Sequence, residues 1–532
     1  MATGVVHVFD PNRFVSSVGG LTGATVYFYY TGTTNPAPVF SDLALTIPAT
    51  NPVVLAQGAI LPNLYLDPAV IYRRRIVFSD TSVQDVDPIF PRSFAQSVDL
   101  LSTSSNLGAG LIGYNSTATY PASTVGTKLK NIVHATDYGV VGDGIVDDTT
   151  NLQAAINAAV GKILYLPPVF KCGALTVPAK SHLMGTGGKS RITAVSGTYN
   201  MFSITGGDVK IENIFIEDIT KSGGWDFIIT CGTKTLRFID LKNIIVNNSF
   251  GVLTDSGTGT GGVGAHVVTR VQDVLAALHR GPGISLTRGF AYLFFERCSI
   301  DFVGVSASNF TAFNFNLAGH GGAAGGLTLV DCTVLGTCGT YANAAQHGWT
   351  ISNTAAVWMQ RCSADTVAGS GMILDNINAV KMADCWVSLC GGDGIVMTTV
   401  FNSIFVGLAC FGRNYLTPNG AGTDGIRIVS GCYNLNFTGG IVSSWGRHGF
   451  NKSAIQTGAI RITGMLLLSN GLAGVGYGVN DIGNSAMSLV SCGFGSRVQG
   501  KGNLQGTFSC HGLRQLNSGA GNQSAGPGPL TF

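Results

Sequence analysis

The chain has 532 residues, of which 45% are hydrophobic, only 11% are charged and 74 are glycine. Its net charge of +3 is spread without a Lys/Arg stripe, so we expect no nucleic-acid surface. No apolar run approaches the ~18–20 residues that span a bilayer, and we expect no membrane insertion. Glutamate occurs only three times, which disfavours long charged helices and favours an all-β chain.

The first part of the chain, residues 1–95, is predicted to form a small β domain. Aromatic and β-branched stretches alternate there with Pro- and Asn-rich breaks. Residues 96–130 are rich in Ser, Thr and Gly, which predicts a connector. At the other end, residues 516–532 form a Gly-rich tail.

Residues 131–168 contain an acidic motif, DYGVVGDGIVDDT, at Asp137–Thr149. The stretch NLQAAINAAVGKILYLPP after it predicts a short amphipathic helix with Leu152 and Ile156 on one side, then a strand. The acids lack the spacing of an EF-hand, so a structural role is favoured over a metal loop. We predict that the glycines turn the chain and the acids suit a helix N-terminus, in a cap formed by Gly142, Asp143, Gly144, Asp147 and Asp148.

A repeat emerges between residues 169 and 515, where short apolar strands alternate with Gly-containing turns. Gly348, Gly371 and Gly394 are evenly spaced, and Cys362 and Cys385 precede the last two by equal intervals. A period of ~20–25 residues with short strands is typical of a β-solenoid, in which each coil buries its apolar face on its neighbours. With loops inserted in two turns, the cysteine column is predicted to contain Cys332, Cys362, Cys385, Cys410, Gly440 and Met465.

The twelve cysteines include no CxxC pair, and no HExxH motif occurs. Zinc spacing is therefore absent, and a disulfide framework is not typical of so long a chain. We predict no metal and no cofactor, and we expect the column cysteines to be buried as small apolar side chains.

Alternation around this column predicts an outward face that suits a sugar. Trp386 and Phe411 are expected side by side, one coil apart, with Asp365, Ser388 and Arg413 beside them. Two inserted loops would add Tyr341 and Tyr415. Aromatic faces next to charged groups bind sugars, but a face of this kind also packs between subunits, and the sequence leaves both interpretations open.

Three acids are candidate catalytic residues. Asp301 follows Cys298 by the interval that separates Asp365 from Cys362, which predicts two carboxylates about 10 Å apart, borderline for an inverting glycosidase. Asp393 belongs to a column just before the repeat glycines, where an Asp-Gly turn is the favoured interpretation. A lyase would instead need a base and a charge-neutralising group such as Arg413.

Two stretches resemble a known group of proteins. DYGVVGDGIVDDTTNLQAAINAA followed by KILYLPP is similar to the start of right-handed parallel β-helices of the pectate-lyase superfamily, especially those of bacteriophage tailspikes. VFSDLALTIPATNPVVLAQGAILPNLYLDPAVIYRRRIVF resembles the N-terminal virion-attachment module of phage tail proteins, and LIGYNSTATYPASTVGTKLKN resembles the connector after it. The resemblance implies an all-β fold: a right-handed parallel β-helix with a small N-terminal β domain and a short capping helix.

The resemblance also implies partners and a location. It implies a homotrimer that joins the tail hub or adaptor proteins through residues 1–95, is assembled in the host cytoplasm and acts from the virion tail at the host surface. Its β-helix would bind host cell-surface polysaccharide. Whether it also cleaves the polysaccharide stays open, the alternatives being a depolymerase, an adhesin without cleavage and a purely structural tail component.

Overall fold

The computed structural model describes a little under two thirds of the chain, and it divides the chain into two compact units, Met1–Ala118 and Thr119–Phe532. The described residues are 5–6, 23–55, 62–67, 69–89, 129–186, 190–196, 199–217, 227–231, 238–247, 251–255, 268–277, 283–287, 292–302, 311–317, 326–336, 347–412, 422–453, 459–470, 477–481, 487–494 and 498–500. The connector and the C-terminal tail predicted from the sequence lie almost entirely outside these ranges.

The first unit is built from two small antiparallel sheets with strand orders β4-β2-β6-β7 and β1-β5-β3. In β2 and β6 alternate side chains are buried, and Val26, Phe28, Tyr72 and Ile76 are fully enclosed. The strands are β1 Val5–Val6, β2 Thr25–Tyr30, β3 Val39–Phe40, β4 Val53–Val54, β5 Tyr65–Leu66, β6 Tyr72–Val77 and β7 Val83–Ile89.

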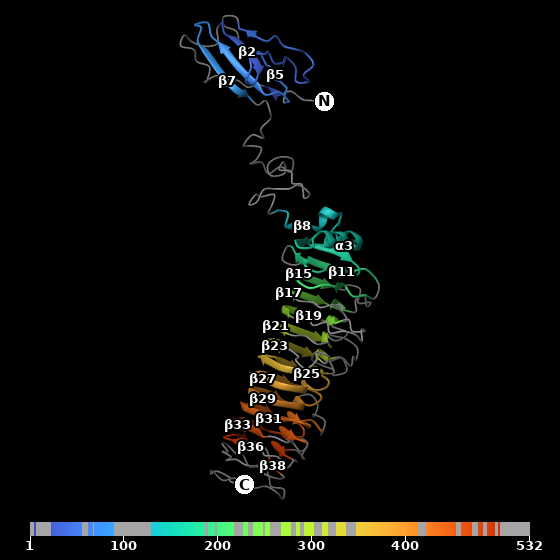
Figure 1. Ribbon diagram of the computed structural model, residues 1–532. Helices are drawn as coiled ribbons and strands as arrows, with labels where there is room; N and C mark the ends of the chain where they lie inside the picture. Colours follow the sequence, from blue (N-terminus) through green and yellow to red (C-terminus); the bar gives the residue numbers. More distant parts are fainter. Residues whose placement is uncertain are drawn as a thin grey trace. The chain divides into compact units, whose positions relative to one another are not determined.

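The second unit is a parallel β-helix, which confirms the predicted fold. Its strands from β8 to β38 stack in chain order, and Figure 1 shows successive coils laid one on another. The strands of the first coils are β8 Ile132–His134, β9 Ile163–Leu166, β10 Val169–Cys172, β11 Leu175–Val177, β12 His182–Gly185, β13 Ser190–Ala194, β14 Phe202–Ile204, β15 Val209–Glu217, β16 Phe227–Cys231, β17 Phe238–Asn247, β18 Gly251–Asp255, β19 Val268–Ala277 and β20 Ile284–Leu286.

Each later coil repeats the same parallel pairing. Its strands are β21 Tyr292–Phe302, β22 Thr311–Asn316, β23 Gly326–Val330, β24 Thr333–Gly336, β25 His347–Gln360, β26 Ser363–Asp365, β27 Met372–Ala383, β28 Trp386–Ser388, β29 Ile395–Phe411, β30 Ile426–Ile428, β31 Tyr433–Ser443, β32 Phe450–Lys452, β33 Ile460–Thr463, β34 Leu466–Leu468, β35 Val479–Asp481, β36 Met487–Val490, β37 Gly493–Phe494 and β38 Val498–Gly500. One continuous apolar cluster runs through the interior of this unit.

A short helical segment closes the first coil. It comprises the 3-10 helix η3 at Ala135–Tyr138 and the α-helix α3 at Thr149–Ala158. Helix α3 buries Leu152 and Ile156 against the interior cluster, so it shields the end of the stack from water (Figure 1). Among the described residues, no helix has both the length and the apolar character needed to cross a membrane.

The predicted cysteine column lies in the interior of the β-helix. The strand registers align Cys298, Cys332, Cys362 and Cys385 in successive coils, and all nine described cysteines are buried and free. Burial raises the pKa of the Cys410 thiol far above its ordinary value. The column therefore serves packing, as expected.

One assignment in the column is wrong. Cys410 pairs with Val387 and not with Cys385, so Leu408 takes the predicted place. Both placements point the side chain inward, because a shift of two residues along a strand preserves the alternation. The sequence pattern could not distinguish them.

The repeat glycines allow the coils to approach closely, and Gly371 illustrates the effect. A β-carbon added there would lie 2.3 Å from Val387 Cγ1 and 2.8 Å from the carbonyl oxygen of Gly394. We expect Gly371→Ala to lower the free energy of unfolding by about 1–3 kcal/mol, measured by urea denaturation, because the core must shift to make room. Gly422→Ala is the control, since nothing lies within 4 Å of its added carbon. Equal stability of the two variants would contradict this account of the column.

A corner between two faces of the β-helix is formed by residues in the left-handed backbone region. In eleven successive coils this corner residue has φ between 49° and 66°. The arginines at the corner pair with the aspartates of the preceding coil: Arg297 Nε lies 2.5 Å from Asp273 Oδ1, and Arg361 Nε lies 2.5 Å from Asp331 Oδ1. The corner residues are Asn213, Asn243, Asp273, Arg297, Asp331, Arg361, Asp384, Gly407, Gly439, Gly464 and Ser491.

Candidate functional site

The predicted acidic pair lies on one outward column of the β-helix. The registers of β21, β24 and β26 place Leu335 directly between Asp301 and Asp365, so the two aspartates are two coils, or about 10 Å, apart at their Cα atoms. Leu335 is 44% exposed and separates the carboxylates with an apolar surface. The next members of this column are Ser388 and Phe411.

The carboxyl group of Asp301 is half-buried, and one of its two oxygen atoms is shielded from water. Its Oδ1 atom is shielded from solvent and accepts no hydrogen bond from the residues that the structure describes. Burial raises the pKa of Asp301, because the charged form loses hydration that nothing nearby replaces. A carboxyl held in this way retains its proton to higher pH than an ordinary aspartate, as a general acid requires.

Asp365 is held quite differently. Its Oδ1 atom accepts hydrogen bonds from Ser388 Oγ at 2.6 Å and from Thr366 Oγ1 at 3.1 Å. These two hydroxyls fix the orientation of the carboxylate on the outward face. The face therefore presents one unpartnered carboxyl and one positioned carboxylate, which are the two groups that acid–base hydrolysis of a glycosidic bond needs.

Ser388 was predicted to face a ligand, and the structure corrects this. Ser388 is only 4% exposed, and its hydroxyl donates a hydrogen bond to Asp365 Oδ1. The reason is local: the serine is short enough to lie under the carboxylate of the preceding coil. Ser388 thus positions Asp365 and offers no surface to a substrate.

Trp386 is 44% exposed on the outward face, one coil beyond Ser363, and is available for stacking. The prediction that Phe411 lies directly beside it is wrong. Trp386 pairs with Ala409, whereas Phe411 pairs with Ser388, because the segment containing Cys410 is shifted by two residues. Phe411 is partly buried and lies diagonally across from the indole. The remaining predicted ligand residues, Arg413, Tyr415 and Tyr341, lie outside the described residues.

Asp393 belongs to a separate column that ties the coils together. It is 8% exposed, and its Oδ1 atom accepts the backbone N–H of Asp424 at 2.7 Å. Burial raises the pKa of Asp393, although the N–H of Asp424 and the guanidinium of Arg427 oppose the shift. The same pattern recurs at His347 and His448, whose Nδ1 atoms accept N–H groups of the next coil. The column therefore forms a hydrogen-bonded ladder, and it does not bring Asp393 to the Asp301 face.

The acidic motif ahead of α3 consists of turns closed by its own carboxylates. Asp148 is 1% exposed and accepts the N–H groups of Val141 and Gly142 at 2.8 and 3.0 Å. Asp143 accepts two backbone N–H groups, and Asp147 accepts the N–H and hydroxyl of Thr149. Gly142 and Gly144 have φ of 70° and 74°, which supply the turns. Over the described ranges, no group of three or more His, Cys, Asp or Glu side chains is arranged to hold a metal ion.

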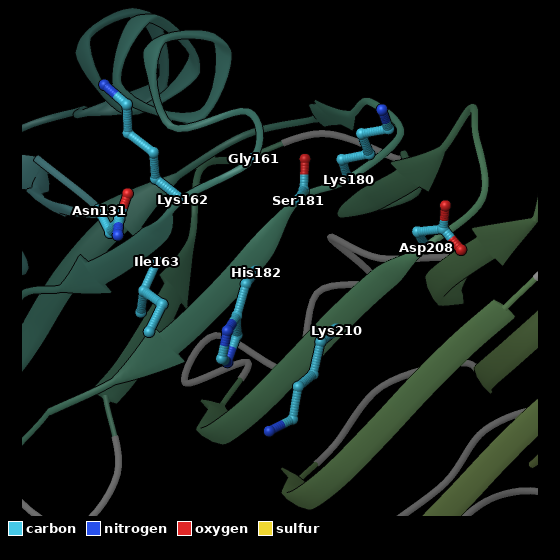
Figure 2. A pocket seen from close by; sticks show the side chains of 9 residues that line it. All are labelled: Asn131, Gly161, Lys162, Ile163, Lys180, Ser181, His182, Asp208 and Lys210. Carbon is cyan, nitrogen blue, oxygen red and sulfur yellow. The ribbon is translucent and has the colours of Figure 1, made fainter. Parts of the chain in front are cut away.

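A shallow cleft that the sequence pattern does not reveal lies on the outward side of the first coils. It has a volume of about 320 Å³, and Figure 2 shows its lining. Three lysines and a histidine line it. Their positions in the sequence are unequally spaced, so they do not share a repeat period. The lining residues are Asn131, Gly161, Lys162, Ile163, Lys180, Ser181, His182, Asp208 and Lys210.

Comparison with known proteins gives two sequence matches, each to a small part of a larger protein. The chain is 40% identical over 78 residues to the capsule K30/K69-specific depolymerase 1 of Klebsiella phage K5-2, a match that spans 14% of this chain and 10% of the relative. It is 38% identical over 76 residues to the tail spike protein of Salmonella phage epsilon15, which spans 14% of this chain and 7% of the relative. No family model matches the chain.

Solved structures of phage tailspikes resemble the chain remotely. Tailspike protein 3 of bacteriophage CBA120 is 14% identical, with a TM-score of 0.43, over 96% of this chain and 81% of that chain. Full-length tailspike protein 2 of an Escherichia coli O157:H7 bacteriophage is 13% identical, with a TM-score of 0.40, over 81% of this chain and 61% of that chain. Over fewer than 80 residues, the chain is therefore similar to a depolymerase and to a tail spike protein of two bacteriophages, and it matches no more than a tenth of the length of either.

Proposed function

We propose that this protein is a phage tailspike whose β-helix binds host-surface polysaccharide and hydrolyses it on the face of Asp301, Asp365 and Trp386. The observation that carries the proposal is the half-buried carboxyl of Asp301, whose shielded Oδ1 atom has no partner among the described residues. Asp240 shares this property, but Asp301 also has the positioned carboxylate of Asp365 two coils away on the same outward column, and the two groups together point to a chemical role. The depolymerase named among the relatives supports the same activity.

In the proposed reaction, water hydrolyses the glycosidic bond between two sugars lying across Leu335. Asp301 donates its proton to the leaving glycosidic oxygen while the bond from that oxygen to the anomeric carbon breaks. A water molecule attacks the same carbon from the other side, and Asp365 accepts its proton. Carboxyl groups ~6.5–9.5 Å apart leave room for this water, and the side chains can reach that range from Cα atoms about 10 Å apart. The proposal therefore specifies inversion at the anomeric carbon.

The proposal also includes the assembly of the protein and its attachment to the virion tail. Residues 1–95 of the N-terminal unit would dock to tail hub or adaptor proteins, and three copies would assemble as a homotrimer in the host cytoplasm before joining the virion tail. The tail spike named among the relatives supports placement on the tail. Sedimentation of the purified chain tests the trimer, and co-purification with tail proteins tests the docking.

The activity is tested by incubating the purified protein with capsule or lipopolysaccharide from the host. New reducing ends without an ultraviolet-absorbing product support hydrolysis. An unsaturated, ultraviolet-absorbing product would instead identify a lyase, and retained binding with neither change would identify an adhesin. Absence of both binding and cleavage would leave a structural tail component.

The location of the polysaccharide is tested with two tryptophans of similar exposure on different faces. Trp386 is 44% exposed beside Asp365, and Trp358 is 42% exposed on the outward side of β25. We expect Trp386→Ala to weaken polysaccharide binding about tenfold, because the ring loses a stacked sugar, and Trp358→Ala to leave it unchanged. Titration calorimetry measures both. If only Trp358→Ala weakens binding, the sugar lies on the other face, and the Trp386 face becomes the candidate subunit interface.

A further inference from the structure

The cleft over the first coils has the composition of a site for an acidic ligand. It lies where β8, β9, β12 and β15 begin, because parallel coils bring the starts of successive strands to the same edge. Three lysines line it, against the carboxylate of Asp208 in the lining and that of Glu212, which contacts Lys210. The lining is therefore positively charged, and it attracts anions.

A buried carboxylate sets the positions of two of the basic groups. Glu212 is 7% exposed, and its Oε1 atom contacts His182 Nε2 at 2.7 Å and Lys210 Nζ at 3.0 Å. Burial raises the pKa of Glu212, but the hydrogen bonds from His182 and Lys210 outweigh burial, and the net pKa is lowered. The ionised glutamate thus anchors one side of the cleft, while Lys162 and Lys180 extend from its other side.

The lysines are spread along the cleft. Figure 2 shows Lys162 and Lys180 extending on one side of His182 and Lys210 extending on the other. A small inorganic anion would contact one of these ammonium groups at a time, whereas a chain with repeated negative charges would meet several. The arrangement therefore fits an extended polyanion better than a single ion.

The same outward face continues into a surface that suits sugar rings. Ile163 lines the cleft, and two residues further along β9 lies Tyr165, whose ring stacks on His134 with 5.3 Å between centroids. Residues two apart on a strand point to the same side, so the aromatic pair adjoins the basic groups. Apolar and aromatic surface next to cationic groups is the combination that binds an acidic sugar.

We propose that this cleft binds a segment of acidic polysaccharide through carboxylates on neighbouring sugars, as a second glycan site separate from the Asp301 face. Lys162 would pair with one carboxylate and Lys180 with another, while Tyr165 contacts a ring. Because no residue of the cleft belongs to the proposed hydrolytic face, the site holds glycan whether or not the chain cleaves it.

The test uses the full chain carrying Asp301→Asn, so that the outcome does not depend on cleavage. Titration calorimetry compares a galacturonate oligosaccharide with its methyl ester, which has the same rings and linkages but no charge. We expect the acid to bind at least ~10-fold more tightly than the ester, and Lys162→Gln/Lys180→Gln to remove about a factor of ten. Lys381→Gln, an exposed lysine on β27, serves as the matched control and should change nothing.

Four results would overturn the proposal. These are equal binding of acid and ester, full binding by the Lys162→Gln/Lys180→Gln variant, loss of binding in Trp386→Ala, and displacement by inorganic phosphate at the concentration of the oligosaccharide. The third would assign the acid to the Trp386 face, and the fourth would show a simple anion site. Circular dichroism confirms that the lysine variants are folded.

Discussion

Asp301→Asn is expected to reduce polysaccharide cleavage by about 10²–10⁴-fold while binding persists, because a general acid supplies a factor of that size. The amide has nearly the shape of the carboxyl group but carries no proton to give to the leaving oxygen. The protein should lose no stability at neutral pH, since the half-buried charge is removed together with its cost of desolvation. Reducing-end assays and urea denaturation measure the two effects.

The pH dependence gives this prediction a second readout. The pKa of Asp301 is raised by burial, so the folded state binds the proton more tightly than the unfolded chain does. The resulting stabilisation is fully present below the unfolded pKa of ~3.9 and is lost as the pH rises through the folded pKa. Cleavage should fall over the same upper range, because the acid loses its proton.

Asp240→Asn is the matched control for Asp301→Asn. Asp240 also has a shielded Oδ1 atom without a hydrogen-bond partner among the described residues. It lies on the neighbouring face of the β-helix, where the strand registers place it between Lys210 and Arg270. It should retain full cleavage. Equal losses in the two variants, or full cleavage by Asp301→Asn, would remove Asp301 from the proposed mechanism.

Asp424→Asn is expected to lower the free energy of unfolding by about 1–3 kcal/mol, the cost of leaving buried hydrogen-bond donors without their acceptor. Asp424 is fully buried and accepts hydrogen bonds from Arg447 Nε at 2.8 Å, from Asn451 Nδ2 at 2.6 Å and from the N–H of His448 at 3.1 Å. An amide has one acceptor oxygen for these donors and no charge to balance the guanidinium of Arg447.

Asp331→Asn is the control for this substitution. Asp331 pairs with Arg361 at 2.5 and 2.8 Å, but both side chains are exposed, and exposed pairs contribute less than ~1 kcal/mol. Asparagine also tolerates the left-handed backbone of this position, so the change tests the charge alone. Urea denaturation followed by tryptophan fluorescence compares the variants, since Trp445 is buried in the coils near Asp424. Similar losses would mean that the buried network is not the source of the stability.

The repeat made much of the β-helix predictable. Each coil buries its neighbours' apolar side chains, so the interior column could be found from the cysteines and the outward column from the offset of Asp301 and Asp365. The shift at Cys410 could not be found, because inserted loops of unknown length leave registers two residues apart equally apolar. Ser388 was misplaced because alternation gives the direction of a side chain but not its burial beneath Asp365.

The basic cleft could not be predicted from the sequence repeat, for a different reason. Its side chains come from positions just before strand starts, in coils of unequal length, so Lys162 and Lys180 share no repeat with Lys210. Only the stacking of β9, β12 and β15 reveals that they are neighbours. A site formed between coils can be found from the sequence when its residues keep one offset in the repeat, as Asp301 and Asp365 do, and the cleft residues keep none.

The corner of aspartates and arginines gives the coils an order that their apolar pattern lacks. The interior columns consist of similar apolar side chains, so a coil could pack on a coil other than its proper neighbour. A stack that omits one coil would then still bury its apolar side chains. Along the corner, however, skipping the coil of Asp331 would set Arg297 against Arg361, and skipping the coil of Arg297 would set Asp273 against Asp331. Each such error places like charges about 5 Å apart on adjacent coils. The alternating charges of the corner thus slightly disfavour a stack in which one of these coils is omitted.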